Sequence, residues 1–353
     1  MSDQQQEAAV PVTTDERARV EAAAEHAGAE GRLDAVRRRG DVFAGLLRNL
    51  GLVLVLLLLC IIGTITSDNF LTSDNIRNIL VSSSVIGVVT VGMTFVIIGG
   101  GIDLSVGALV ALASVWATTL ATQDYGPVVM VLCALLVGLC AGLINGTLIA
   151  YGRLVPFIVT LAMLVSARGL AAKIANNRTQ IVDQQAIKDI ARRDIVGVPL
   201  LVVILGVVLA VGWVLLNRTT FGRRTFAIGG NAEAARLAGI DVRRHTVMLY
   251  ALSGICCGIA AVMLVARTTT GSSTHGNLYE LDAIAAVIIG GTLLSGGRGT
   301  LIGSFLGVLV FTTITNIFIL NNLATEVQNI AKGVIIVAAV LFQSRAQRTT
   351  SAT

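Results

Sequence analysis

The sequence predicts an all-α membrane protein that crosses the bilayer about ten times. Hydrophobic residues make up 54% of its 353 residues and charged residues only 13%, and the mean hydropathy is +0.81. A soluble domain carries about twice that charged fraction. These values exclude an ordinary cytosolic enzyme and a mostly disordered chain. The 37 glycines, against only 4 prolines, are typical of helices that pack closely in lipid.

Residues 1–45 differ from the rest of the chain because acids and arginines alternate there without a long apolar run. This charged stretch is too long for a signal peptide, and no small-residue cleavage site follows the first apolar segment. We expect a polar, flexible cytoplasmic tail at 1–45, a transmembrane domain at 46–342 and a cytoplasmic C-terminal tail at 343–353.

Ten segments approach the roughly 20 apolar residues that a membrane span needs. The eighth is short and lies between an acidic pair, Glu280 and Asp282, and a glycine turn at 295–297, so it is a candidate half-span. The segments are 46–66, 76–98, 104–121, 127–150, 155–175, 198–216, 246–266, 281–294, 301–320 and 327–342.

The distribution of basic residues predicts that both termini are cytoplasmic. With that orientation most of the 26 Lys and Arg residues fall in inside segments, above all in the tail and in the loop 217–245. The exception is the outside loop 173–197, which is long and carries both signs of charge. We expect this loop to form a small folded external element.

The first motif is the triplet Gly99, Gly100 and Gly101, followed by Asp103 and Ser105. Consecutive glycines weaken a helix and allow close backbone approach, and a carboxylate in apolar surroundings is expensive and usually paired or functional. One interpretation is that Asp103 or Ser105 caps the next helix. The other, compatible with it, is a broken helix that lines a pathway.

The second motif lies in the loop 217–245 and predicts a short helix at 232–238 outside the membrane. Asn231 is a good N-cap, Glu233 suits the positive end of the helix dipole, and Gly239 is a natural C-terminal stop. So short a helix does not fold alone. It is either a surface turn packed on its own chain or a helix that docks into a partner.

The third motif begins with the acids Glu280 and Asp282 and continues through glycines to Thr300, a predicted cap of the ninth span. The glycine cluster lacks the G-K-[ST] ending of a phosphate-binding loop, so no nucleotide site is predicted. The five cysteines and three histidines form no pattern typical of a metal site or of catalysis. Lys332, near the start of the tenth span, is expected to snorkel to the outer interface.

Taken together, GGGIDLSVGALVALAS, GGNAEAARLAGI and YELDAIAAVIIGGTLLSGGRGT resemble, in order and spacing, the permease subunit of ribose-type ABC sugar importers. The resemblance covers nearly the whole membrane part. It implies two permease subunits, expected to be identical, around a central pathway in the bacterial inner membrane. It also implies separate ATPase subunits that hold ATP and Mg²⁺, and an external sugar-binding protein. No cofactor and no enzymatic activity are expected in this chain.

The resemblance also implies roles for the motif residues. Coupling to the ATPase is expected for part of the second motif: Gly230, Asn231, Glu233, Ala234, Ala235, Leu237 and Gly239. A pathway or gating role is expected for Gly99, Gly100, Gly101, Asp103 and Ser105, and a possible pathway turn for Gly290, Gly291, Gly296 and Gly297.

Other functions remain as alternatives. The same ABC mechanism could carry a branched-chain amino acid or a polyol. An ion-coupled secondary transporter would need several facing carboxylates inside the membrane, and Asp103 is the clear candidate. An intramembrane enzyme has no support, because no paired acids or Ser/His arrangement occurs.

Overall fold

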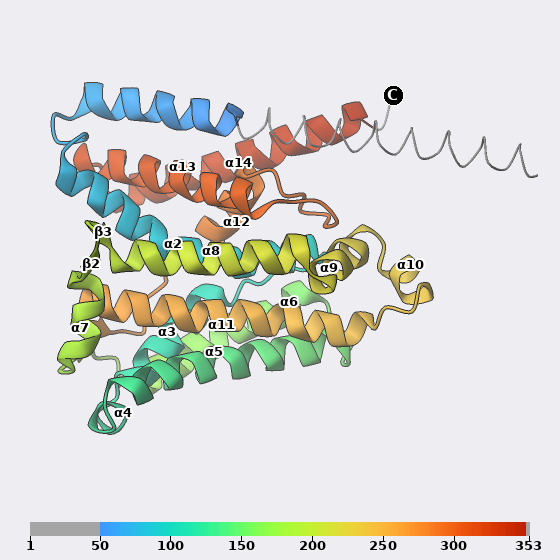
Figure 1. The fold of residues 1–353 in the computed structure, drawn as a ribbon, viewed down its shortest axis with the longest axis horizontal. Coiled ribbons are helices and arrows are strands. Elements are labelled where there is room, and N and C mark those ends of the chain that lie inside the picture. The colour runs from blue at the N-terminus through green and yellow to red at the C-terminus, as the bar shows by residue number, and fades with distance from the viewer. Residues whose placement is uncertain (1–49, 351–353) are drawn as a thin grey trace, which may run out of the picture. The chain divides into compact units, whose positions relative to one another are not determined.

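The computed structural model describes the backbone of residues 50–350 and the side chains of residues 50–341. The predicted tail at 1–45 lies outside the described residues. Within them the chain is helical, with only four two-residue strands (Figure 1). The described helices are Leu50–Thr66, α2 Ser73–Ile98, α3 Val106–Ala117, α4 Leu120–Asp124, α5 Pro127–Ala150, α6 Pro156–Ile174, α7 Gln185–Arg192, α8 Leu200–Arg218, α9 Thr220–Gly230, α10 Ala232–Leu237, α11 Val242–Thr268, α12 Tyr279–Ile289, α13 Leu301–Leu320 and α14 Thr325–Thr350.

Each of the ten predicted segments overlaps a described helix. The all-α membrane class is confirmed, and the number of ten crossings stays a prediction. Within residues 50–350, six helices are long and apolar enough to cross a bilayer: α2, α5, α6, α8, α11 and α13. The segment predicted as the third span is interrupted: α3 covers 12 of its residues, and its last two residues belong to α4. With 11 residues, α12 is equally short, as its flanks suggested. At 1.5 Å per residue each is about 18 Å long or less, roughly half a membrane. The last helix, α14, continues past the predicted end of the tenth span to Thr350.

The helices form two similar series. A long helix, a half-length helix and two further long helices follow one another in α2, α3, α5 and α6, and again in α11, α12, α13 and α14. The two series pack crosswise, because α2 lies against α13 while α11 lies against α5. Arg267 donates to Ser82 at 2.9 Å and Ser253 packs on Gly92, so α2 and α11 run antiparallel. The second series is therefore inverted relative to the first.

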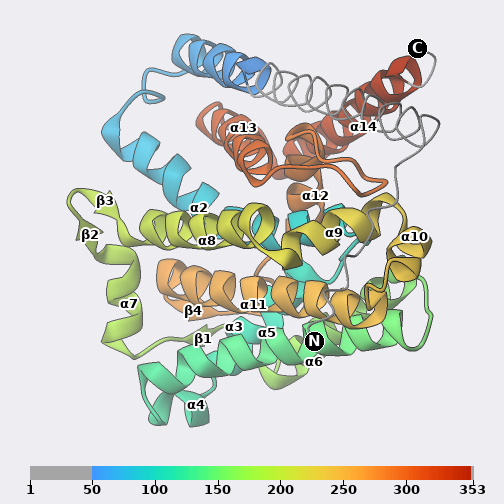
Figure 2. The same ribbon diagram turned by 45° about the vertical axis from the view of Figure 1, so that its right-hand side comes forward.

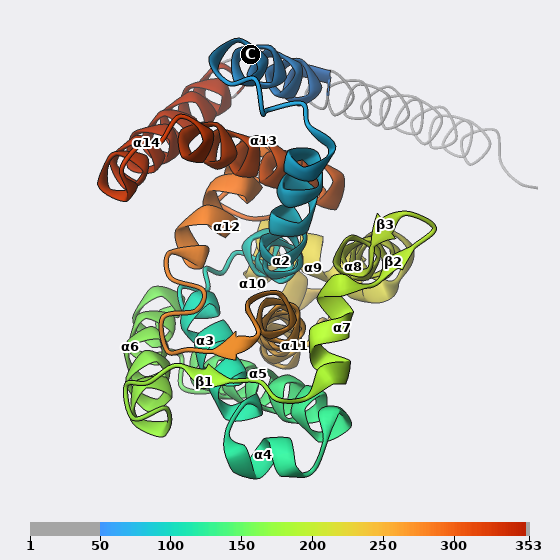
Figure 3. The same ribbon diagram turned by 90° about the vertical axis from the view of Figure 1, so that its left-hand side faces the viewer.

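The two leading helices, α2 and α11, occupy the middle of the bundle. Figure 3, which looks along the helices, places them between the group α12, α13 and α14 and the group α5 and α6. Most of α2 is buried, whereas α5, α6 and α8 are largely exposed on the outside of the helix bundle. The core of the fold consequently forms around α2, α3 and α11.

Glycines allow α5 and α11 to pack in backbone contact. Gly138, Gly142 and Gly146 recur every four residues along α5 and lie on one face. A Cβ at Gly138 would overlap the carbonyl oxygen of Gly254 on α11, and a Cβ at Gly142 would overlap that of Tyr250. Small residues at this spacing are how helices associate closely in lipid.

The loops divide between two ends of the helices. At one end, which we call the α7 end, the loop after α6 folds as expected into α7 and short strands. Strand β1, Gln180–Ile181, pairs with β4, Thr270–Gly271, and β2, Asp194–Ile195, pairs with β3, Val198–Pro199. Arg77 of α2 holds this element through a bidentate ion pair with Asp194, both bonds 2.7 Å long, and this contact lowers the pKa of Asp194. The opposite, α10 end carries α9 and α10 (Figures 1 and 2).

Candidate functional site: a capped helix and a glycine junction

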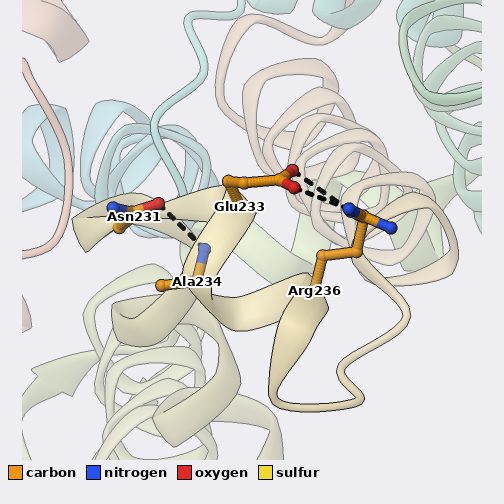
Figure 4. Close-up of polar contacts among 4 residues, drawn as sticks. All are labelled: Asn231, Glu233, Ala234 and Arg236. Atoms are coloured by element: carbon orange, nitrogen blue, oxygen red, sulfur yellow. Dashed lines mark hydrogen bonds and ion pairs between the residues drawn. The ribbon is translucent and has the colours of Figure 1, made fainter.

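The helix predicted at 232–238 is present as α10, and its ends are built as the sequence indicates. The Asn231 side chain accepts a hydrogen bond from the Ala234 amide at 2.9 Å (Figure 4), which satisfies one of the unpaired amides of the first turn. At the other end Gly239 has a φ of 81°. This left-handed residue lets the Ile240 amide bond back to the Ala235 carbonyl at 3.0 Å. The helix is thus closed at both ends by local bonds.

Most of the α10 surface is exposed. Only Ala235 is buried, whereas the Leu237 side chain is 75% exposed. Glu233 and Arg236 form an exposed ion pair of 2.6 Å one turn apart (Figure 4), and the hydrogen bond from Arg236 lowers the pKa of Glu233. An exposed leucine beside a fixed pair of opposite charges is a surface with both apolar and polar features, as protein interfaces have.

Three glycine turns meet directly behind this helix. They are the turn after α2, the end of α9 and the turn between α12 and α13. The Gly297 amide donates to the Ile98 carbonyl at 2.9 Å. A Cβ at Gly229 would overlap that same carbonyl oxygen, and a Cβ at Gly296 would lie 2.9 Å from the Cα of Gly100. We call this cluster the glycine junction: Gly99, Gly100, Gly229, Gly230, Gly296 and Gly297.

The glycine junction joins all three sequence motifs. The turn after α2 leads into α3, and the turn after α12 leads into α13. Gly229 closes α9 and is followed within three residues by α10. Backbones in contact transmit displacement without a flexible side chain between them. Main-chain contacts thus connect the glycines just before α10 with the turn that precedes α3 and the turn that follows α12.

Asp103 lies apart from the junction, in a fully buried network at the start of α3. Its carboxylate accepts hydrogen bonds from the Ser105 amide at 3.0 Å and from the Ser105 hydroxyl at 2.6 Å. The Ser253 hydroxyl of α11 donates to the other carboxylate oxygen at 2.9 Å, and Asn145 of α5 donates to the Ser105 hydroxyl at 2.9 Å. These bonds fix the turn before α3 to two other helices.

The network corrects the capping prediction, because neither the Asp103 nor the Ser105 side chain bonds an amide of α3. Asp103 bonds the amide two residues further on, so it orders the turn that precedes α3, and the Ser105 side chain makes no capping bond. Beside it, the Tyr250 hydroxyl donates to the Ile102 carbonyl at 3.2 Å. It also lies 2.6 Å from where a Cβ at Gly101 would stand. The pathway role of Asp103, Ser105 and the three glycines stays a prediction.

The third motif separates into two parts. Gly290 and Gly291 end α12, and a Cβ at Gly290 would overlap the backbone of Gly303 on α13. Gly296 and Gly297 belong to the glycine junction. Thr300 caps α13 as predicted, accepting from the Gly303 amide at 3.1 Å.

Sequence reasoning missed one contact near this motif. Lys332 was expected to reach the outer interface, but its ammonium lies 3.1 Å from both carboxylate oxygens of Asp282. Both side chains are largely buried, with 17% and 16% exposed. The only signal in the sequence was that an acid and a base each occur inside an apolar segment.

Comparison with known proteins agrees with this architecture. A family described as "Branched-chain amino acid transport system / permease component" matches residues 75–340. The "Ribose import permease protein RbsC" of Bacillus subtilis (strain 168) is 40% identical over 305 residues, which cover 86% of this chain and 95% of the relative. The protein of the same name in Escherichia coli (strain K12) is 38% identical, covering 88% and 98%.

A further relative is the "L-arabinose ABC transporter permease protein AraH" of Azospirillum brasilense, at 37% identity over 87% of this chain and 90% of the relative. No solved structure matches the chain. The family match extends over nearly all of the helices described above, including both half-length helices and the glycine junction. This multi-pass membrane protein belongs to the family of transport-system permease components.

Proposed function

We propose that this chain is the membrane-spanning permease subunit of an ATP-driven importer that moves a monosaccharide such as ribose into the cell. The similar proteins are named as ribose, arabinose and xylose permeases, which supports a sugar as the cargo. The observation that carries the proposal is α10, an exposed helix that is capped at both ends. The two glycines just before it, Gly229 and Gly230, contact the turns after α2 and after α12.

In this proposal α10 is the coupling helix. Leu237 and the Glu233–Arg236 pair dock on an ATPase subunit, and closure of the ATPases on ATP and Mg²⁺ displaces α10. The glycine junction passes that displacement to the turns after α2 and α12. The spans then change their packing around the pathway, and the sugar crosses.

The other partners follow from the same proposal. The α10 end faces the cytoplasm together with both termini, and the α7 end faces outward toward a sugar-loaded binding protein. Two copies of the chain enclose one pathway in the bacterial inner membrane. ATP and Mg²⁺ are held by the ATPase subunits, and this chain carries no cofactor.

Two other cargoes share this mechanism. The description of the family names branched-chain amino acids, and a polyol resembles a sugar in its hydroxyls. Labelled leucine and labelled ribitol therefore belong in the same uptake experiment as the sugars. An ion-coupled transporter would work without ATPase subunits, so uptake by the permease alone would contradict the proposal.

The experiment measures uptake of labelled ribose, arabinose and xylose into vesicles that hold the permease, its ATPase subunits and its binding protein. Leu237→Arg is expected to lower uptake at least tenfold and to reduce co-purification of the ATPase. The matched control is Val196→Arg, a similarly exposed apolar position on the turn between β2 and β3, which should leave co-purification intact. Equal co-purification with Leu237→Arg and wild type would contradict the role of α10.

A further inference from the structure

A polar cavity lies between α2, α12, α13 and α14, away from the glycine junction. Its volume is about 240 Å³, enough for about eight waters at their share of liquid volume. Its lining combines three charged side chains, several hydroxyls and an amide with two aromatic rings. The lining residues used in the argument are Ser82, Tyr279, Asp282, Phe311, Thr312 and Lys332.

The cavity belongs to the half of the spans nearer the α7 end. Ser82 lies nine residues after the start of α2 and Lys332 seven residues after the start of α14, which is about 14 Å and 10 Å along the helix axes. Arg267, at the other end of α11 from α10, also borders the cavity. A solute released at the outer face would enter this half first.

The Asp282–Lys332 pair is hard to explain by stability alone. Two ions taken out of water lose hydration that their attraction often fails to restore, and an apolar pair of similar size is commonly as stable or more stable. Ionisable groups inside membrane segments usually mark the path of a substrate or an ion. Here both groups border an open space.

The pair has unused hydrogen-bonding capacity toward that space. A carboxylate offers about four acceptor positions and an ammonium three donors. Among the described residues, the side chains of Asp282 and Lys332 form hydrogen bonds, both 3.1 Å long, only with each other. The Lys332 ammonium also lies 5.4 Å from the centre of the Phe311 ring. Adjacent hydroxyls of a sugar both donate and accept, so they match a carboxylate and an ammonium side by side. The apolar faces of the sugar ring match the aromatic walls.

We propose that this cavity is an entry site that binds the monosaccharide: Asp282 and Lys332 bond its hydroxyls, and Phe311 and Tyr279 contact its ring. The inference rests on the proposed function, because it identifies where the imported sugar first contacts this chain. A neutral sugar leaves the charge balance of the pair unchanged, so it can enter and leave without a compensating ion.

The test uses the complete complex in vesicles and a paired substitution, Asp282→Leu with Lys332→Met. Either single change would strand one buried charge and damage folding, whereas the pair removes both charges together. The expected result is normal assembly, normal stimulation of ATP hydrolysis by the loaded binding protein, and ribose uptake at least tenfold below wild type. The matched control, Arg77→Met with Asp194→Leu, removes an exposed ion pair outside the cavity. Because this pair lies at the α7 end, its uptake is measured at saturating loaded binding protein, where it should equal that of wild type.

Two further variants keep the proposal testable if the paired variant does not assemble. Thr312→Val removes one hydroxyl at constant shape, and Phe311→Leu removes one ring; each is expected to raise the KM for ribose uptake about threefold to tenfold. They should also change the preference among ribose, arabinose and xylose, which a purely structural defect would not. Wild-type KM and preference in both would overturn the entry site.

The outcomes separate the two proposals. Wild-type sugar uptake by the assembled paired variant would overturn the entry site and leave the importer function intact. Uptake of leucine but of no monosaccharide by the wild-type complex would overturn both.

Discussion

The two half-length helices occupy corresponding places in the inverted series, yet their starts are built in opposite ways. The turn before α3 is held by a fully buried carboxylate that receives three hydrogen bonds, one of them from a hydroxyl on another helix. Every residue of α3 except Trp116 is buried. The start of α3 is thus bonded to both α11 and α5.

The start of α12 has no comparable network. Its N-cap, Leu278, makes no side-chain cap bond. The Oε2 atom of Glu280 is buried without a hydrogen-bond partner in the part of the chain that the structure describes. Asp282 faces a cavity and pairs with Lys332. The comparison teaches that the start of α3 is bonded to its neighbours through Asp103. The start of α12 instead places a charged side chain, Asp282, at the wall of a cavity.

The largest effect is expected from Asp103→Ala, which tests the bonds at the start of α3. The change leaves the Ser105 amide, the Ser105 hydroxyl and the Ser253 hydroxyl without their acceptor. Each buried unsatisfied group costs about 1–3 kcal/mol, so the free energy of unfolding should fall by at least about 3 kcal/mol. Thermal unfolding in detergent measures this. Asp103→Asn keeps one acceptor oxygen and should lose less, and an unchanged melting temperature for Asp103→Ala would break the comparison.

The next effect concerns the junction that both half-helices share. In Gly229→Ala the added Cβ overlaps the Ile98 carbonyl oxygen, so α9 must move away from both turns. Uptake should fall at least tenfold while the ATPase subunits still co-purify. In Gly230→Ala no described atom lies within 4 Å of the added Cβ, and a loss of no more than about twofold is expected. Equal losses in the two variants would contradict transmission through the junction.

The contact between α3 and the loop before α12 is expected to make the stability of the protein depend on pH. His275 Nδ1 lies 3.2 Å from the Ser114 hydroxyl of α3, and burial together with the Arg168 charge lowers the pKa of His275 from 6.5 to about 4. The folded protein therefore keeps this histidine neutral where the unfolded chain would protonate it. This contribution to stability is complete above pH 6.5 and is lost as the pH falls toward 4.

Melting temperatures at pH 7.5 and pH 5 check this contribution. The decrease between these values should be smaller in His275→Gln than in wild type, because glutamine does not titrate. An equal decrease in both proteins would assign the pH dependence to other groups.

The smallest effect is expected at Gly239, which touches neither half-helix. Its φ of 81° disfavours a side chain, so Gly239→Ala should cost about 1–2 kcal/mol, localised to α10. Gly239→Asn should cost less, since asparagine tolerates this conformation. Hydrogen exchange of the α10 amides measures the difference. Identical exchange in both variants would show that the end of α10 is held by something other than its backbone conformation.

The parts of the site that depend on neighbouring residues could be predicted from the sequence. Asn231 and Gly239 close α10, and Thr300 caps α13, because each bond joins residues within a few positions. The length of α3 was missed because the apolar run continues to Ala121. The chain in fact breaks at Thr118, and Thr119 caps α4 by accepting from the Thr122 amide. Two adjacent threonines were the available signal.

Contacts between distant segments could not be read in the same way. The glycine junction joins residues from three turns that lie far apart in the chain, and each glycine doublet looks alike in the sequence. Lys332 and Asp282 are likewise fifty positions apart. The sequence indicates that a charged residue is costly within a membrane segment. Only the packing of the helices determines which residue it pairs with.

The crosswise packing of the two series has a consequence for how the chain is made. Ser253, which bonds Asp103, is synthesised about 150 residues after it, and β1 pairs with a strand that follows α11. At 12 residues, α3 is too short to hold itself across a bilayer. During synthesis, therefore, the turn before α3 gains its hydrogen bond from Ser253 only after α11 has been made. A nascent chain that stops after α8 should leave α3 accessible to water-soluble labelling reagents, and one that extends past α11 should protect it.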